Sequence, residues 1–172
     1  MKTLYLLRHA KAAPEAALGD ARRPLAKRGR KAAKAMAEFL ATLDPAPQLV
    51  LCSTALRTRE TLELILPALN PPPTVAYEDR LYLAEASELL ERVRKVQDET
   101  RCALVVGHNP GLHEFGARLA VDPGRLAEGF PTAALAALEV PGSWIDLQWQ
   151  KAKLVLYQTP KALARDLDPE AD

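Results

Sequence analysis

Glycine and aromatic residues are scarce in this chain, and each shortage argues against a class of function. Only 8 of the 172 residues are glycine, and the sequence contains neither Gly-x-Gly-x-x-Gly nor Gly-x-x-x-x-Gly-Lys-Ser/Thr. Dinucleotide and P-loop nucleotide binding therefore lack the glycine-rich loop that holds their phosphates. Aromatic residues make up 5% of the chain, too few for the stacking surface that binds single-stranded nucleic acid. We expect no nucleic-acid partner.

Cysteine and long apolar segments are equally scarce. The two cysteines, Cys52 and Cys102, form no Cys-x-x-Cys pair, so we expect buried free thiols and no metal site. No apolar run approaches the roughly 18 residues of a membrane span. Only Lys2 separates Met1 from the first apolar run, so we expect no signal peptide. These observations predict a cytoplasmic protein without a membrane partner.

Charge is balanced over the whole chain but unevenly placed. The formal net charge is +1, yet the first 34 residues contain ten Lys/Arg against Glu15 and Asp20. The densest basic stretch consists of Arg22, Arg23, Lys27, Arg28, Arg30, Lys31 and Lys34. Such a stretch is either an ordinary solvated surface or a source of attraction for an anionic substrate.

Apolar patterns alternate between strand and helix along the chain. We predict strands at 2–7, 48–52, 74–77, 102–106, 132–140 and 152–158, and helices near 27–42, 55–68, 85–99 and 110–120. The segment 144–150 is expected to be a turn or an extra strand. Alternation of this kind predicts an α/β fold over residues 1–160, a single three-layer domain with a mostly parallel central sheet, helices on both faces and an antiparallel edge. The charged tail at 161–172 is expected to fray.

Three of the predicted strands end at residues suited to binding phosphate. Arg8 and His9 follow the first strand, Ser53 and Arg57 follow the second, and His108 follows the fourth. The carboxyl ends of parallel strands face one crevice, so we expect two arginines and two imidazoles to meet there. The planar donor fork of arginine matches two phosphate oxygens at once. This combination predicts a site for a phosphoryl group.

The two histidines differ in their expected roles. A nucleophilic imidazole must be neutral, and Arg8 and Arg57 would lower its pKa. His9 is the preferred nucleophile because it lies between the strand and the basic loop, although spacing alone does not establish the order. We expect His108 to donate a hydrogen bond to the phosphoryl oxygens, and we expect His113, which lies within a predicted helix, to be structural.

These residues resemble the motifs of the histidine phosphatase superfamily. The matching segments are Arg8-His9-Ala10, where the family has Arg-His-Gly, Ser53 with Arg57 and Thr61, and Gly107-His108-Asn109-Pro110. The short chain is most similar to the SixA-type phosphohistidine phosphatases, a branch that also matches the segments 20–29, 131–134 and 156–161. The resemblance spans nearly the whole sequence.

The resemblance implies a phosphoglycerate mutase-like fold and a phosphoenzyme reaction without metal or cofactor. In this scheme His9 attacks phosphorus, while Arg8, Arg57 and His108 hold the phosphoryl group until water releases phosphate. The implied substrate is a phosphohistidine on a signalling protein. The glutamate that follows the triplet in the mutase-like branch is replaced by Lys11-Ala12, which argues against a mutase.

The general acid is the open question of the sequence. Glu78, Asp79 and Glu85 follow the third predicted strand. Glu85 is our first candidate for the acid, and the competing role is that of a surface carboxylate or a charge at the N-terminus of a helix. A weak or missing acid would favour phosphoramidates, acyl phosphates and aryl phosphates over alkyl esters. The imidazole of a phosphohistidine leaves readily once it is protonated from solvent. Two alternatives remain. The protein is either a phosphatase of small phosphorylated metabolites or a phosphate-binding interaction module with impaired turnover, for which Ala10 is the best indication.

Overall fold

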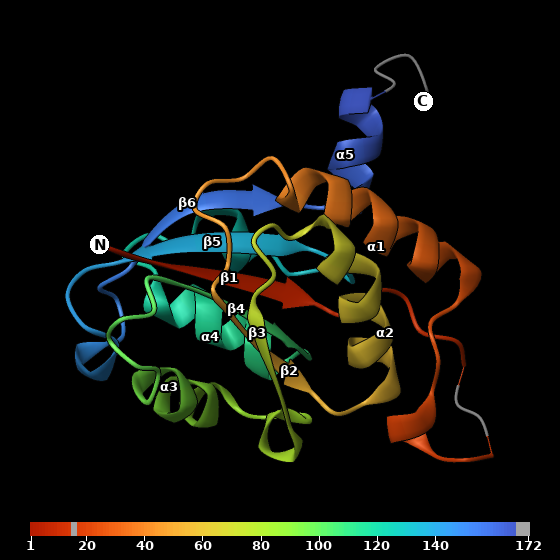
Figure 1. The fold of residues 1–172 in the computed structure, drawn as a ribbon, viewed down its shortest axis with the longest axis horizontal. Coiled ribbons are helices and arrows are strands. Elements are labelled where there is room, and N and C mark those ends of the chain that lie inside the picture. The colour runs from red at the N-terminus through yellow and green to blue at the C-terminus, as the bar shows by residue number, and fades with distance from the viewer. Residues whose placement is uncertain (15–16, 168–172) are drawn as a thin grey trace.

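A six-stranded mixed sheet forms the centre of the structure, and helices cover both of its faces (Figure 1). The computed structural model describes residues 1–14 and 17–167. Its strands are β1 (Lys2–Arg8), β2 (Leu49–Ser53), β3 (Thr74–Glu78), β4 (Cys102–Gly107), β5 (Leu135–Val140) and β6 (Lys153–Gln158). They follow the order β3-β2-β4-β1-β5-β6, with parallel pairing from β3 to β1 and antiparallel pairing of β5 and β6. The expected three-layer fold with an antiparallel edge is confirmed.

The helices are α1 (Lys27–Leu40), α2 (Leu56–Ile65), α3 (Ala86–Arg94), α4 (Gly111–Leu119) and α5 (Pro160–Leu167). The helix expected to reach residue 99 ends at Arg94, where i→i+3 hydrogen bonds to Lys95 and Val96 close the last turn. We expected the chain to fray from residue 161. This expectation is wrong up to Leu167, because residues Pro160–Leu167 form α5 and Leu163 is buried. The expected tail beyond Leu167 lies outside the described residues.

Alternating side chains of the central strands divide the core into two layers. On β1, Leu4 and Leu6 pack with α3 and α4, whereas Tyr5 and Leu7 pack with α1, α2 and α5. A strand with apolar side chains on both faces is stable only when both faces are covered. The helices on each side of the sheet in Figure 1 provide this cover.

The strand order brings the three phosphate-binding motifs together. Strand β4 lies between β1 and β2, and all three run in the same direction. In the register of the sheet Arg8 lies beside Gly107, and Cys52 lies beside Val106. The segments that follow these strands therefore emerge at one edge of the sheet, as the crevice rule for parallel sheets requires.

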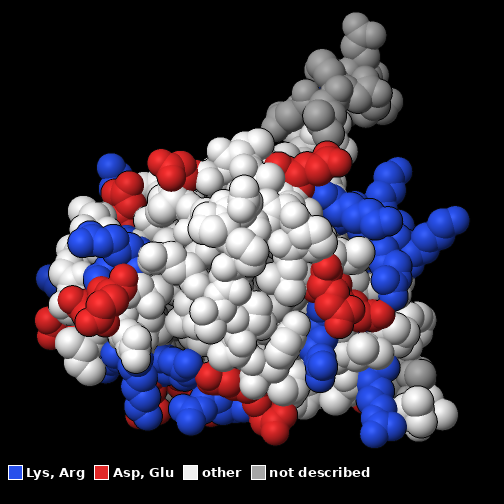
Figure 2. All heavy atoms as spheres, in the orientation of Figure 1, with Lys and Arg blue, Asp and Glu red and all other residues white. Residues whose placement is uncertain are grey.

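Basic side chains gather over α1. Its sequence from Lys27 to Lys34 contains five Lys or Arg residues, all of them exposed. Figure 2 shows these blue side chains on the right-hand side of the molecule, where Figure 1 places α1. Among the described residues, no helix is both long enough and apolar enough to cross a membrane.

Candidate active site

A cavity of about 230 Å³ lies at the carboxyl ends of β1, β2 and β4. Its lining consists of Arg8, His9, Lys11, Ala12, Arg23, Arg57, Leu83, His108, Asn109 and Thr132. The four residues that the sequence assigns to one site, at positions 8, 9, 57 and 108, therefore line a common cavity. They come from three separate parts of the chain.

His9 enters the cavity because the backbone turns at the end of β1. Its N–H donates to the carbonyl of Gly107 at 3.1 Å, and the N–H of Ala133 reaches the carbonyls of Arg8 and His9 at 3.1 and 3.0 Å. Ala133 has a φ of +59°, the left-handed conformation that such a turn needs. The ring Nδ1 of His9 lies 2.8 Å from the carbonyl oxygen of Ala10. Because a carbonyl only accepts, Nδ1 carries the proton and Nε2 keeps the free lone pair.

His108 is oriented by a serine at the end of β2. Its Nε2 lies 2.8 Å from Oγ of Ser53, and that oxygen accepts the N–H of Ala55 at 3.3 Å. Nε2 of His108 is the acceptor that the described hydrogen bonds offer to the buried Ser53 hydroxyl proton, so Ser53 donates to Nε2 and the proton of His108 lies on Nδ1. Within the described part of the chain this Nδ1 is buried and has no partner. The His9 and His108 rings lie 5.4 Å apart between centroids, and both residues line the cavity.

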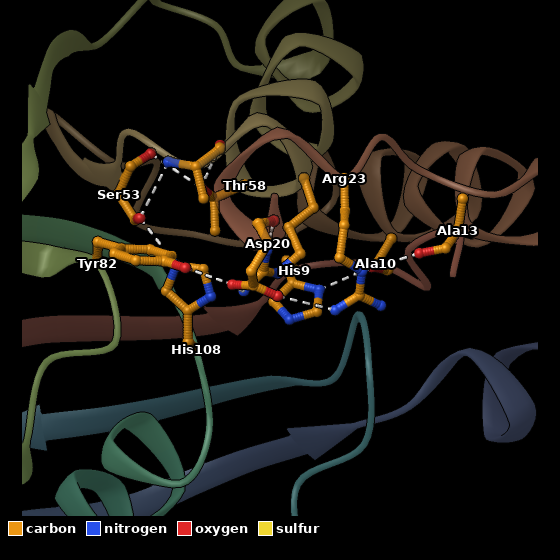
Figure 3. Close-up of polar contacts among 11 residues, drawn as sticks. His9, Ala10, Ala13, Asp20, Arg23, Ser53, Thr58, Tyr82 and His108 are labelled. Atoms are coloured by element: carbon orange, nitrogen blue, oxygen red, sulfur yellow. Dashed lines mark hydrogen bonds and ion pairs between the residues drawn. The ribbon is translucent and has the colours of Figure 1, made fainter. Parts of the chain in front are cut away.

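The side chain of Arg57 is buried and binds Asp20, which lies close to Arg23 and Tyr82 in Figure 3. The two terminal nitrogens of Arg57 donate to the backbone carbonyl and to Oδ2 of Asp20 at 2.8 and 3.0 Å. Asp20 also accepts from Arg23 at 3.1 Å and from the hydroxyl of Tyr82. The Tyr82 hydroxyl, followed by Arg23 and Arg57, holds the pKa of the Asp20 carboxyl well below its usual range. Asp20 therefore stays ionised and ties the loop before α1 to the cavity.

Arg8 and Asn109 share one backbone acceptor. The Nη1 of Arg8 and the Nδ2 of Asn109 donate to the carbonyl of Phe130 at 3.2 and 2.8 Å. In the described structure the Nε of Arg8 and the Oδ1 of Asn109 are buried without a partner. Burial, and then the charge of Arg57, lowers the pKa of Arg8. Two guanidinium groups thus stand close enough to repel each other, an arrangement that an anion between them would stabilise.

Burial and the surrounding cations keep both imidazoles neutral. Desolvation is the largest cause that lowers the pKa of His9 to about 4, and Arg57, Arg8 and Arg23 add to it against the hydrogen bond to Ala10. Desolvation followed by Arg57 lowers the pKa of His108 to about 3. Both rings are therefore uncharged near neutral pH, as nucleophilic attack by His9 requires.

Ala10 fits where the family has glycine. It is fully buried, and its φ is not in the positive range that favours glycine. Its N–H donates to Oγ1 of Thr61 at 3.0 Å, and the Thr61 hydroxyl donates to the carbonyl of Arg57 at 2.7 Å. The methyl group packs with Leu25, Ala33 and Ala133. The turn after His9 therefore forms without the conformational freedom of glycine.

The carboxylates expected near the cavity lie elsewhere. Glu85, the first candidate for the acid, forms a capping box with Glu88 at the start of α3 and does not line the cavity. Glu78 accepts two hydrogen bonds from Arg92 at 2.7 and 2.8 Å, and Asp79 accepts from Thr54 at 2.7 Å. We expected these carboxylates near the cavity from their position after the third strand, whereas each side chain is held by a partner that does not line the cavity.

Sequence reasoning missed the contribution of Tyr82. Its ring meets the His108 ring edge-on with 5.4 Å between centroids, and its hydroxyl bonds to Asp20. No local pattern marks a tyrosine in a loop as part of a site. Asp20 and Arg23, in contrast, were present in the matched segment 20–29, but without an assigned role. The described residues contain no group of three or more His, Cys, Asp or Glu that could hold a metal ion.

Comparison with known proteins assigns the family. A model of the histidine phosphatase superfamily (branch 1) matches residues 4–85. An uncharacterized protein of Mycobacterium tuberculosis is 36% identical over 162 residues, which cover 90% of this chain and all of the relative. A structure from Nakamurella multipartitia, named as a phosphohistidine phosphatase SixA, is 36% identical with a TM-score of 0.83, covering 92% of this chain and 96% of the other. The protein histidine phosphatase SixA in complex with tungstate gives 25% identity and a TM-score of 0.79, with 94% and 99% of the two chains covered. The chain belongs to the histidine phosphatase superfamily and, within it, to the SixA-type branch.

Proposed function

We propose that this phosphatase removes the phosphoryl group from phosphohistidine on a protein, with His9 as the nucleophile and without a metal ion. The observation that carries the proposal is the cavity in which Arg8, His9, Arg57 and His108 meet. The SixA names of the similar structures support the substrate class, and the free buried thiols of Cys52 and Cys102 support a reducing compartment such as the cytoplasm.

The reaction proceeds in two displacements. In the first, the Nε2 lone pair of His9 forms a bond to phosphorus, and the bond between phosphorus and the substrate imidazole breaks. The leaving imidazole takes that electron pair and is neutralised by a proton. In the second, a water oxygen attacks phospho-His9, the new P–N bond breaks, and its electrons return to His9 Nε2. The water proton passes to phosphate or solvent, so the enzyme is regenerated as inorganic phosphate departs.

The surrounding donors stabilise the phosphoryl oxygens. Arg8 and Arg57 supply the positive charge that a metal ion supplies in other phosphatases. The Nδ1–H of His108, which has no partner in the described structure, adds a neutral donor. Because these groups are held by Phe130, Asp20 and Ser53, little reorganisation is needed when charge moves onto the oxygens.

The position of the carboxylates supports phosphohistidine rather than an alkyl phosphate. An alkoxide needs a proton from an acid as it leaves, whereas a histidine imidazole is readily protonated from water. Glu78, Asp79 and Glu85 do not line the cavity, and Asp20 is held in its ionised form by its donors. The metabolite phosphatase alternative requires an acid in this place.

Rapid-quench kinetics test the proposal. We expect wild-type protein mixed with a phosphocarrier protein, labelled at histidine with ³²P, to show acid-labile enzyme-bound phosphate that decays as phosphate is released. His9→Ala should show neither. His113→Asn is the matched control, because His113 lies on α4 with its Nε2 at 2.5 Å from the carbonyl of Leu126 and does not line the cavity.

The same assay separates the alternatives. If sugar phosphates or glycerophosphates are hydrolysed faster than the labelled protein, the substrates are small phosphorylated metabolites and not protein phosphohistidine. Tight phosphate binding with no turnover of any of these compounds would make the protein an interaction module.

A further inference from the structure

A second, larger hollow opens directly beside the catalytic cavity. This basic groove has a volume of about 660 Å³ and shares Lys11 and Thr132 with the lining of the cavity. Lys11 follows His9 by two residues, so their Cα atoms lie within about 7 Å of each other. The volume falls within the range of about 300–1,000 Å³ that is typical of ligand sites. A substrate held at His9 would therefore extend into this groove.

The lining of the groove is strongly positive. It includes Lys11, Arg28, Arg125 and Lys161, all exposed, and none of its described residues is a carboxylate. Among the side chains of residues 1–14 and 17–165, none of these four forms an ion pair, whereas Arg30 on the same helix as Arg28 pairs with Glu60 at 2.6 Å. Like charges around a hollow attract anions from solution.

Part of the groove is already fixed in shape. The guanidinium of Arg125 stacks over the ring of Tyr157 at 4.7 Å from its centroid, and the Tyr157 hydroxyl donates to the carbonyl of Gly129 at 2.8 Å. Burial and the negative charge of the nearby Glu128 raise the pKa of the Tyr157 hydroxyl, but Glu128 does not line the groove. The buried Thr159 accepts the N–H of Ala162 at 3.1 Å and so begins α5, whose first turn has no acidic side chain. The positive end of this helix adds to the field of the four cations.

The four cations come from four separate parts of the fold. Lys11 follows β1, Arg28 lies on α1, Arg125 lies in the turn Gly124–Ala127, and Lys161 lies on α5. A small dianion could meet one or two of them, whereas an extended chain with several carboxylates could meet all four. Apolar lining residues such as Pro131 and Tyr157 offer contacts for the backbone and stems of such a chain.

We infer that the basic groove binds an acidic segment of the phosphorylated protein, next to the phosphohistidine that occupies the cavity. The inference rests on the proposed function and extends it from reaction type to partner recognition. Exposed charges of this kind mainly speed association and set its salt dependence. The groove therefore selects acidic partners, while the cavity performs the chemistry.

Two peptides of equal length test the inference. Each contains one histidine, phosphorylated with phosphoramidate and flanked either by glutamates or by glutamines. We expect wild type to hydrolyse the acidic peptide with kcat/KM about tenfold higher at low salt, and the advantage to shrink as ionic strength rises. Arg28→Gln/Arg125→Gln/Lys161→Gln should bring the two values close together, mainly by raising KM for the acidic peptide.

A charge-matched variant controls for net charge. Lys34→Gln/Lys95→Gln/Lys153→Gln removes the same number of cations from exposed positions outside the groove and should keep the preference. Equal rates for the two peptides with wild type, or an unchanged preference in the groove variant, would overturn the inference. Equal peptide rates combined with groove-dependent hydrolysis of phosphoglycerate would assign the groove to metabolites instead.

A binding measurement separates the groove from the reaction. Fluorescence anisotropy of the unphosphorylated acidic peptide requires no turnover. We expect the groove variant to weaken this binding by about fivefold or more, consistent with the loss of several exposed charge pairs. Normal groove-dependent binding without hydrolysis of either phosphopeptide would contradict the proposed phosphatase function alone. Hydrolysis without groove-dependent binding would contradict the groove alone.

Discussion

Asp20 holds both terminal nitrogens of Arg57, one through its backbone carbonyl at 2.8 Å and the other through its carboxylate at 3.0 Å. The carboxylate is half-exposed, whereas the Arg57 side chain is almost fully buried. A loop residue therefore fixes the orientation of a cation that lies at the cavity. Asp20 also accepts hydrogen bonds from Arg23 and Tyr82, and these contacts make the segment before α1 part of the site.

Removal of the Asp20 charge should affect binding and turnover in opposite directions. We expect Asp20→Asn to lower kcat about tenfold, because a charge-assisted hydrogen bond that orients Arg57 is weakened. The loss of one negative charge should at the same time make inorganic phosphate a tighter inhibitor. Steady-state kinetics with p-nitrophenyl phosphate and phosphate inhibition provide both values. A parallel loss of kcat and phosphate affinity would instead indicate a general structural defect.

Arg57 itself should be far more important for turnover than for folding. We expect Arg57→Ala to lower kcat/KM by about 10²–10³-fold, the usual effect of removing a transition-state donor. Arg59→Ala is the matched control, because Arg59 lies two residues further along α2 and stacks over Tyr77 on the surface. Circular dichroism of both variants checks their folding. Near-normal rates in folded Arg57→Ala would remove Arg57 from the reaction.

Much of the site could be predicted because it depends on strand ends. Short apolar runs that end at Arg8, Ser53 and Gly107 give the strands, and the parallel sheet rule then brings their ends together. The Asp20–Tyr82 contact could not be predicted, because it joins residues 62 positions apart in two irregular loops. No periodic pattern determines how such loops meet.

Capping signals at the starts of two helices are present in the sequence. Glu85 is followed three residues later by Glu88, a pair that can cap a helix in both directions. Thr159-Pro160 likewise combines a helix N-cap with a proline at the first helical position, and the apolar Leu163 follows where α5 faces the core. The first signal agrees with the helix predicted from residue 85, whereas the second corrects the charged tail expected from residue 161.

The neutral imidazoles lead to a prediction about pH. By proton NMR we expect the His9 ring to titrate near 4 and the His108 ring near 3 in the folded protein, and these two rings to titrate near 6.5 in urea. The folded state thus binds fewer protons than the unfolded state between these values, so stability falls as pH falls from about 6.5 toward 4. For His9 alone the loss amounts to about 3 kcal/mol. Ordinary titration of both rings near 6.5 in the folded protein would contradict this account.

The alanine after His9 should contribute to stability without limiting the reaction. Ala10 is buried at a φ that alanine adopts without strain. We expect Ala10→Gly to lower the free energy of unfolding by about 1–2 kcal/mol, through the lost methyl burial and the greater backbone entropy of the unfolded chain. The value of kcat should stay within about twofold, since the hydrogen bond from the backbone N–H to Thr61 is kept. A large rise in kcat would show that Ala10 impairs turnover and would favour the interaction-module alternative.

Gly29 fixes the distance between α1 and the segment after His9. A Cβ at this position would lie 2.1 Å from the carbonyl oxygen of Lys11, which also accepts the N–H of Ala26 at 2.9 Å. Alanine normally stabilises a helix by about 1 kcal/mol relative to glycine, but here the backbones must separate. We expect Gly29→Ala to lower the free energy of unfolding by about 1–3 kcal/mol, and to lower kcat because Lys11 and His9 move with the same segment. Urea denaturation and steady-state kinetics measure the two effects, with Lys27→Ala on the exposed side of α1 as the control that should remain within about 0.5 kcal/mol. A Gly29→Ala protein that is more stable than wild type would show that this close approach does not hold the segment in place.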